Sequence, residues 1–318
     1  MAINKFMLSA LRALSYADID VKKNYAAERK LQLQGALPLS SPLLYKIDDR
    51  TITLDGYDIP VRIFEPKNKI SDQLLLFFHG GGWVTGNIDS YSRVCSVLAS
   101  RTGRAVFSVD YRLAPEHPFP HAVNDCYFVT RELFLNKSFG LNGDDIILIG
   151  DSAGGNLAAA VSLMARDKGE FAVKNQILIY PSTYNDHTDS SPFPSVRENG
   201  TDYLLTSKKI CDYMALYCQS PGDIASPYFA PLLTETFRDQ PRTLIITAEY
   251  DPLRDEGEAY GLRLRDYGGY AEIHRMPDAL HGFFSLPYRY VHVKNSYELI
   301  NRFIARGGGA ERRHAYEQ

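Results

Sequence analysis

A serine stands between two glycines in Gly150-Asp-Ser-Ala-Gly154, which fits the pattern G-x-S-x-G. In proteins with this pattern, a strained turn from a strand into a helix lifts the serine hydroxyl above a sheet. The pattern alone is weak, because average use of glycine and serine produces it by chance in roughly one chain of this length in ten. Here the apolar run Ile146–Ile149 precedes it and the alanine-rich stretch Asn156–Lys168 follows it. This placement makes Ser152 a strong candidate nucleophile.

A serine that attacks a carbonyl also needs hydrogen-bond donors for the oxyanion that develops. The stretch His79-Gly-Gly-Gly-Trp83 directly follows the apolar run Leu74–Phe78, and consecutive glycines let bare amides point at one spot. We expect donors from Gly81 and Gly82, with Gly80 as a further candidate, and from the amide of Ala153. The alternatives are a flexible glycine-rich turn or a phosphate loop, but neither G-x-x-x-x-G-K-[ST] nor a G-x-G-x-x-G after a strand is present.

A base and an orienting acid would complete such a site. Among eight histidines, His281 stands out because it lies in a loop just after the last expected strand. Asp251 follows an expected strand in the same way, and open α/β sheets bind ligands beyond the carboxyl ends of their strands. Glu249 and Asp255 are rivals for the acid, although either could be a loop carboxylate or a helix N-cap.

The segments that must position these residues alternate between short apolar runs and longer helix-like stretches. Nearly continuous apolar runs are typical of strands that are buried on both faces. Expected strands of this kind are Leu74–Phe78, Ala105–Val109, Ile146–Ile149, Ile177–Tyr180 and Thr243–Ile246, and a sixth parallel strand fits Ala271–Met276. Expected helices are Ser90–Ser100, Ala122–Leu135, Asn156–Lys168, Glu256–Tyr267 and Val293–Ala305. The pattern predicts an α/β fold with a mostly parallel, twisted sheet and helices on both faces, joined at its edge by an antiparallel pair, Thr51–Leu54 with Val61–Phe64.

Two regions fall outside this alternation. About sixty residues separate Tyr180 from Pro241, too many for one crossover helix, and we expect them to form an ordered cap with a helical piece at Ser207–Gln219. Residues 1–45 are expected to contribute N-terminal helices to this cap, including an amphipathic helix at Met1–Tyr16. We expect residues 46–318 to form the catalytic domain, with the cap inserted at about 184–235 and a frayed tail from Gly307.

Composition excludes several classes of partner. A net charge of -3 does not attract nucleic acid or anionic membranes, and no stretch approaches eighteen uninterrupted apolar residues, so no membrane span is expected. Arg12 interrupts the apolar start of the chain, which argues against a signal peptide. The four cysteines show no C-x-x-C pairing, so we expect buried free thiols and a cytoplasmic location.

Taken together, the motifs resemble the hormone-sensitive lipase family of α/β-hydrolases, in its bacterial esterase branch, and are similar to acetyl esterases. The resemblance extends from about Leu74 to Phe284 and rests on His79-Gly-Gly-Gly-Trp83, Asp110-Tyr-Arg-Leu-Ala-Pro-Glu-His117, Gly150-Asp-Ser-Ala-Gly-Gly-Asn156, Tyr250-Asp-Pro-Leu-Arg-Asp255 and His281-Gly-Phe283. It implies Ser152 as nucleophile, Asp251 as acid and His281 as base, in the chain order of α/β-hydrolases.

The resemblance also implies that the N-terminal helices and the insertion near Tyr203 and Met214 form a lid over an acyl pocket. Trp83 could line that pocket or fill the core beneath the cap. Tyr184 and Tyr203, with Tyr213 and Tyr217, could line an apolar slot, with ordinary packing as the alternative. We expect Asp151 to brace the oxyanion loop.

The motif that begins at Asp110 is interpreted mainly as structure. We expect Asp110, Arg112 and Glu116 to be hydrogen-bonded around a turn that Pro115 and Pro118 fix, with direct substrate contact as the alternative.

The resulting hypothesis is a serine carboxylic ester hydrolase that acts on short-chain, acetyl-like esters through an acyl-enzyme, with no metal and no cofactor. The same residues could act on lactones, carbamates, amides or longer acyl lipids. A remote alternative is a non-catalytic receptor, because plant gibberellin receptors resemble this family, but those have lost the histidine that is intact here as His281. An exposed antiparallel edge strand in the C-terminal half could pair two subunits as a homodimer.

Overall fold

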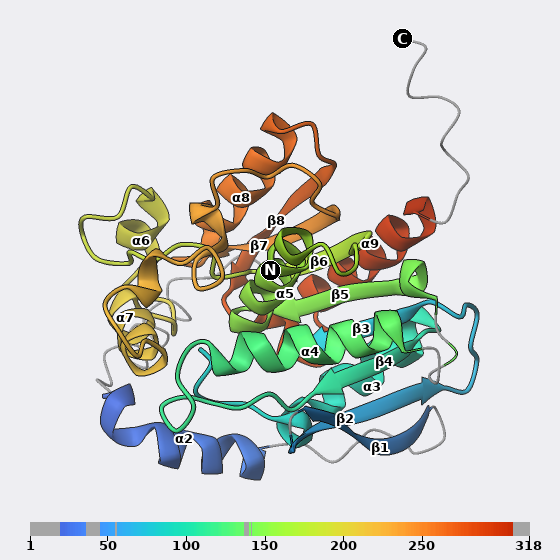
Figure 1. Ribbon diagram of the computed structural model, residues 1–318. Coiled ribbons are helices and arrows are strands. Elements are labelled where there is room, and N and C mark those ends of the chain that lie inside the picture. Colours follow the sequence, from blue (N-terminus) through green and yellow to red (C-terminus); the bar gives the residue numbers. More distant parts are fainter. Residues whose placement is uncertain (1–19, 36–44, 55, 137–139, 141, 308–318) are drawn as a thin grey trace.

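The computed structural model describes residues 20–35, 45–54, 56–136, 140 and 142–307, and eight strands of this part form one sheet in the order β1-β2-β4-β3-β5-β6-β7-β8 (Figure 1). The strands are β1 (Tyr45–Leu54), β2 (Tyr57–Pro66), β3 (Leu74–Phe78), β4 (Ala105–Val109), β5 (Ile146–Asp151), β6 (Asn175–Ile179), β7 (Arg242–Tyr250) and β8 (Ala271–Leu280). β1 and β2 pair antiparallel, and β2 pairs antiparallel with β4. All pairs from β4 to β8 are parallel, which confirms the predicted sheet and its antiparallel edge.

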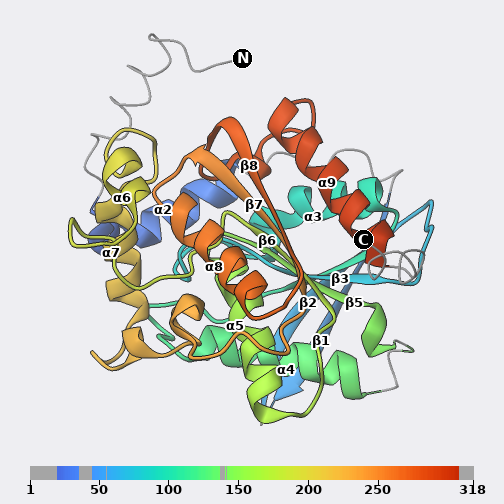
Figure 2. The same ribbon diagram turned by 90° about the horizontal axis from the view of Figure 1, so that it is seen from above.

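Helices cover both faces of this sheet, and Figure 2 shows the sheet between the two layers. One layer consists of α3 (Ile88–Thr102) and α9 (Val291–Gly307). The other consists of α4 (His121–Leu135), α5 (Ala153–Lys168) and α8 (Arg254–Asp266). All five were predicted from the sequence, each within a few residues of its observed ends.

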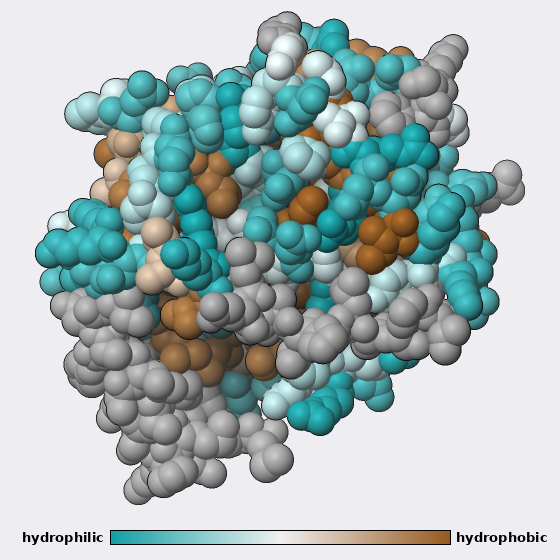
Figure 3. All heavy atoms as spheres, turned by 90° about the horizontal axis from the view of Figure 1, so that it is seen from below, coloured by the Kyte–Doolittle hydropathy of each residue, from teal (hydrophilic) through white to brown (hydrophobic). Residues whose placement is uncertain are grey.

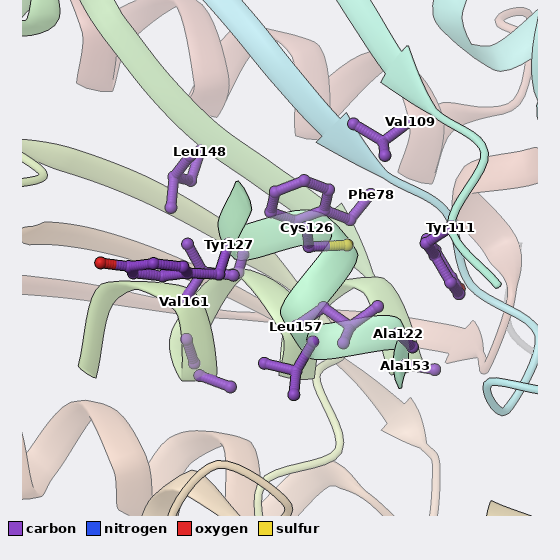
Figure 4. Close-up of a cluster of buried hydrophobic side chains, with 14 of the residues drawn as sticks. Phe78, Val109, Tyr111, Ala122, Cys126, Tyr127, Leu148, Ala153, Leu157 and Val161 are labelled. Carbon is purple, nitrogen blue, oxygen red and sulfur yellow. The ribbon is translucent and has the colours of Figure 1, made fainter. Parts of the chain in front are cut away.

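Strand β3 shows how the apolar runs build two cores. Successive side chains of a strand point to opposite faces, so Leu74, Leu76 and Phe78 pack against the α4–α5–α8 layer, and Leu75 and Phe77 pack against the α3–α9 layer. In Figure 4 the side chains of the first core, including Phe78 and Leu148 from the sheet, lie among those of α4 and α5. Burial on both faces explains why the strand is apolar at every position.

Three further helices lie at one end of the sheet, on the left of Figure 1. They are α2 (Val21–Gly35), α6 (Pro194–Asn199) and α7 (Ser207–Tyr217), and α2 contacts α7. α6 was not predicted, because a six-residue helix is too short to show a periodic pattern. The expected helix at Met1–Tyr16 and the tail after Gly307 lie outside the described residues.

Two expectations about the C-terminal half were wrong. The edge strand there, β8, runs parallel to β7 and not antiparallel. Pro277–Leu280, expected as part of a loop, continues β8, and its pairing brings Leu280 opposite Tyr250. The missed continuation contains a proline and an aspartate, Pro277 and Asp278, which are unusual in a central strand and tolerated at a sheet edge.

The surface carries scattered apolar side chains. The face seen in Figure 3 is mostly hydrophilic, with separate hydrophobic patches. None of the helices in the described ranges is long and apolar enough to cross a bilayer.

The turn from β5 into α5 leaves no room for a side chain at Gly150 or Gly154. A Cβ atom on Gly154 would lie 1.9 Å from the carbonyl oxygen of Phe78, and one on Gly150 would lie 2.2 Å from the carbonyl oxygen of Gly154. These distances are far below any real contact, and the neighbours are backbone atoms that cannot move aside separately. Both glycines are therefore required by the close approach of helix and strand.

We predict that Gly154→Ala lowers the free energy of unfolding by about 3 kcal/mol or more, because the added methyl group overpacks the contact with β3. Gly222→Ala is the matched control, since a Cβ there meets only Ser220 Oγ at 3.9 Å and φ is −75°. Urea unfolding of both variants checks this expectation. Equal stabilities for the two variants would contradict it.

Candidate active site

Strand register brings the predicted site residues to one edge of the sheet. Phe78 at the end of β3 pairs with Gly150 of β5, so the glycine loop and Ser152 emerge side by side. Tyr250 of β7 pairs with Leu280 of β8, so the next residues, Asp251 and His281, also emerge together. Segments far apart in the sequence therefore meet where the parallel strands end.

Ser152 occupies the strained position of its turn. Its φ is 54° and its ψ is −119°, a conformation that is costly for a residue with a side chain. Backbone bonds hold it there, because its amide donates to the carbonyl oxygen of Ile179 (2.9 Å) and its own carbonyl oxygen accepts from the amide of Asn156 (3.0 Å). The buried Asn156 side chain donates to the carbonyl oxygens of Ser182 (2.9 Å) and Phe229 (2.8 Å), which fixes the start of α5 against the segments that follow β6.

The structure brings Ser152, His281 and Asp251 into a continuous chain of contacts. His281 Nε2 lies 2.9 Å from Ser152 Oγ, and His281 Nδ1 lies 2.7 Å from Asp251 Oδ2. The second oxygen of the fully buried Asp251 accepts from the amide of Leu253 (2.9 Å). A carboxylate beside Nδ1 favours the tautomer with the proton on that nitrogen, which leaves Nε2 as an acceptor facing the serine hydroxyl.

The rival carboxylates have other partners. Glu249 accepts a hydrogen bond from the amide of Asp278 (2.6 Å). Asp255 accepts from the amide of Ser195 (2.8 Å) and from Arg254 Nε (2.8 Å). Both therefore fix loops around the site, and Asp251 is the carboxylate that reaches His281.

Within the glycine loop, the amide of Gly80 is not available as a donor to the oxyanion, although it was a candidate. Its amide donates to Asp151 Oδ1 (2.9 Å), so its hydrogen is already committed. Gly81, Gly82 and Ala153 line the cavity in front of Ser152. In the part of the chain that the structure describes, the amides of Gly81 and Gly82 donate no hydrogen bond to another protein group.

His79, at the start of this loop, is a structural residue. Burial lowers the pKa of His79 to about 4, so the ring is neutral at ordinary pH. Its Nδ1 lies 2.8 Å from the carbonyl oxygen of Gly80 and therefore carries the proton and donates to it. Tyr111 stacks on the ring with centroids 4.2 Å apart, and its hydroxyl donates to the carbonyl oxygen of His79 (2.7 Å).

Asp151 braces the glycine loop, as the sequence suggested. The buried carboxylate accepts from the amide of Gly80 and from the hydroxyls of Tyr91 (3.0 Å) and Tyr180 (3.3 Å). Burial nevertheless raises the pKa of Asp151 to about 6, against these donors, which lower it. The Asp151 carboxylate that joins the turn at Ser152 to the glycine loop is therefore ionised only at a cost in free energy, because its charge is buried.

A cavity of about 180 Å³ lies in front of Ser152. Besides the residues already described, it is lined by residues of α2 and α7 and by residues of the loops around the site: Gln32, Trp83, Thr85, Leu205, Ile210, Tyr213, Leu253, Gly282 and Ser285. Trp83 fills both roles considered for it, because it lines the cavity and stacks on Tyr217 with centroids 4.7 Å apart.

Three expected pocket residues, Tyr184, Tyr203 and Met214, do not line this cavity. Met214 is buried in the core, Tyr184 packs edge-on against Phe193, and Tyr203 stacks on Tyr250. Helical spacing in α7 offered a signal for Ile210 and Tyr213, which share one face three residues apart. Nothing in the sequence pointed to Gln32.

The motif that begins at Asp110 is structural, but its charged residues do not bond to one another. Asp110 accepts from the amide of Ile88 (3.1 Å), Arg112 forms a bidentate pair with Asp125, and Glu116 pairs with Arg29 of α2 (2.9 and 3.0 Å). In place of the expected hydrogen bonds around one turn, these three residues bond to three different helices, α3, α4 and α2.

No group of three or more histidine, cysteine or acidic side chains is arranged to hold a metal ion among the residues the structure describes.

The raised pKa of Asp151 predicts a pH-dependent stability. The folded protein keeps a proton there up to about pH 6, whereas the ordinary value is 3.8, so ionisation destabilises the folded state as pH rises through this window. Between pH 5 and pH 8, we expect wild type to lose about 1.4 kcal/mol of unfolding free energy relative to Asp151→Asn, which cannot ionise. Urea unfolding of both proteins at pH 5 and pH 8 measures this change. If the unfolding free energies of wild type and Asp151→Asn differed by the same amount at both pH values, the prediction would be contradicted.

Comparison with known proteins places the chain in a family. A family model described as alpha/beta hydrolase fold matches residues 75–285. An arylesterase of Saccharolobus solfataricus is 36% identical over 241 residues, covering 75% of this chain and 77% of the relative. An ethyl acetate hydrolase of Pseudomonas putida is 33% identical over 246 residues, covering 76% of each.

The solved structure of a hyperthermophilic esterase from the archaeon Pyrobaculum calidifontis superposes with a TM-score of 0.82 at 34% identity, covering 98% of this chain and 100% of that one. The chain therefore belongs to the α/β-hydrolases, in the hormone-sensitive-lipase-like group of esterases.

Proposed function

We propose that this protein hydrolyses short-chain carboxylic esters, with Ser152 as nucleophile, His281 as base and Asp251 as the orienting acid. The observation that carries the proposal is the unbroken line of contacts from Asp251 Oδ2 to His281 and from His281 Nε2 to Ser152 Oγ (2.7 and 2.9 Å). Ser152 faces a cavity that Gly81, Gly82 and Ala153 also line.

In the first half-reaction, Ser152 Oγ attacks the ester carbonyl carbon while its proton passes to His281 Nε2. Asp251 stabilises the resulting imidazolium through Nδ1. The negative carbonyl oxygen accepts hydrogen bonds from the amides of Gly81, Gly82 and Ala153, each typically worth about 3 kcal/mol in the transition state. The tetrahedral intermediate then expels the alcohol oxygen, which takes the proton from His281.

In the second half-reaction, water attacks the acyl-enzyme and gives its proton to His281. Collapse of the new intermediate returns that proton to Ser152 Oγ and releases the carboxylic acid. The serine and the base supply the whole covalent route, so no cofactor enters the scheme.

The size of the cavity supports short acyl chains. At about 180 Å³ it lies below the roughly 300 Å³ at which pockets begin to hold drug-sized ligands. Leu205, Ile210 and Tyr213 bound it on the side of the cap. We therefore propose that α2, α6 and α7, with the rest of residues 184–235, form the lid that sets acyl-chain length.

Location and assembly belong to the same proposal. All four cysteines are free, and Cys95 and Cys126 are buried, which favours a reducing cytoplasm. We propose a homodimer formed through the outer edge of β8, because that edge has no strand partner among the described residues.

We predict that Ser152→Ala lowers kcat for a short-chain nitrophenyl ester by about 10,000-fold or more, because no other group forms the acyl-enzyme. Release of nitrophenol measures the rate. Ser190→Ala, on the exposed surface of the cap, is the control and should keep full activity. A Ser152→Ala variant that kept its rate would refute the assignment.

We also predict that kcat/KM, measured with nitrophenyl esters from acetate to decanoate, is greatest between acetate and butyrate. Ile210→Ala should move the maximum to longer chains, because it removes atoms that line the cavity. Leu262→Ala, at an exposed position of α8, should leave the maximum unchanged. A wild-type maximum at long chains would rule out the short-acyl proposal.

A further inference from the structure

Helix α2 is attached to the molecule mainly by polar contacts. Among its described side chains only Val21 is buried, and the others are partly or fully exposed. Glu28 accepts from the hydroxyl of Tyr213 (2.9 and 3.0 Å), and Arg29 donates to the carbonyl oxygens of Val84 (2.7 Å) and Ala114 (2.8 Å). The helix is thus fastened to α7 on one side and to the segment that follows the glycine loop on the other.

Gln32 makes the contact nearest to the glycines. Its Oε1 accepts from the amide of Gly86 (2.9 Å), and its Nε2 donates to Thr85 Oγ1 (3.2 Å). The orientation of the side-chain amide follows from its partners, because the amide of Gly86 can only donate and must therefore face the oxygen. The nitrogen is left to face Thr85, whose hydroxyl accepts.

Thr85 connects Gln32 to the glycine loop. Its single hydroxyl proton is donated to the carbonyl oxygen of Gly81 (3.0 Å). The same oxygen accepts from the amides of Val84 (3.1 Å) and Thr85 (2.8 Å). With Gln32 donating to the hydroxyl oxygen, the hydroxyl proton remains for the bond to the carbonyl oxygen of Gly81.

Three bonds to one carbonyl oxygen fix the orientation of the peptide that joins Gly81 to Gly82. Because a trans peptide is planar, its N–H points away from its carbonyl, so the direction of the Gly82 amide is set at the far end of the same unit. Glycines on both sides, with φ values of 118° and 61°, place few steric limits on rotation of that unit. Hydrogen bonds must therefore hold it.

We propose that Gln32 is a positioning residue for ester hydrolysis: through Thr85 it holds the Gly81–Gly82 peptide so that the Gly82 amide faces the developing oxyanion. The inference rests on the proposed function, and it adds a residue from the N-terminal helix, 53 positions before Thr85, to the determinants of the oxyanion site. Gln32 touches neither Ser152 nor His281 and acts through Thr85.

The test uses Thr85→Val, which keeps the shape of the side chain and removes the hydroxyl, and Gln32→Leu, which removes both amide contacts. We expect kcat to fall about 10- to 100-fold in each, as for a misplaced catalytic group, with KM little changed. The loss should be the same for acetate and butyrate esters. Thr85→Ser should restore activity because it restores the hydroxyl, and Leu31→Gln, on the exposed face of α2, should match wild type.

A double variant tests the relay itself. If Gln32 acts through Thr85, the loss in Gln32→Leu/Thr85→Val is smaller than the product of the two single losses. Thermal melting of every variant checks that each is folded at the assay temperature.

Unchanged kcat in either single variant would overturn the proposal. So would a rise in KM that depends on acyl length, which would make Gln32 a substrate contact, or losses that multiply in the double variant. A different result would contradict the proposed function itself, namely activity retained in Ser152→Ala, so the two failures can be told apart.

Discussion

The site depends on a buried carboxylate that joins two turns. Asp151 sits next to the nucleophile in sequence, and its side chain accepts the amide of Gly80, so the turn at Ser152 and the glycine loop are fixed relative to each other. Two tyrosine hydroxyls also donate hydrogen bonds to this carboxylate, and burial still raises the pKa of Asp151. The fold keeps this unfavourable group because an ionised carboxylate accepts several hydrogen bonds at once and holds backbone in place more firmly than a neutral side chain would.

Much of this arrangement could be predicted from the sequence, for local reasons. Strands buried on both faces are apolar throughout, so β3 to β7 are visible as short runs. Gly154 marks its turn because no side chain fits there. Asp251 and His281 directly follow their strands, and parallel register then brings them together, whatever the length of chain between them.

The rest could not be predicted, because it is decided by tertiary contacts that leave no local pattern. Gly80 resembles its two neighbours in the sequence, and only the position of Asp151 shows that its amide is already used. Tyr184 and Tyr203 are as aromatic as Tyr213, but of these three only Tyr213, which the docking of α7 positions, lines the cavity. The charges of the motif at Asp110 find partners in elements up to 87 residues away, which no turn pattern reveals.

The weak apolar attachment of α2 has a thermodynamic consequence. A helix with one buried side chain among those described, Val21, and one partly buried ring, Tyr25, against the core is expected to open at a lower free energy than the sheet. Warming the enzyme would then release the helix first and loosen the glycine loop while the nucleophile, base and acid stay assembled. Activity would then be lost at a lower temperature than the fold, so the working range of the enzyme would be set by α2 and not by the core.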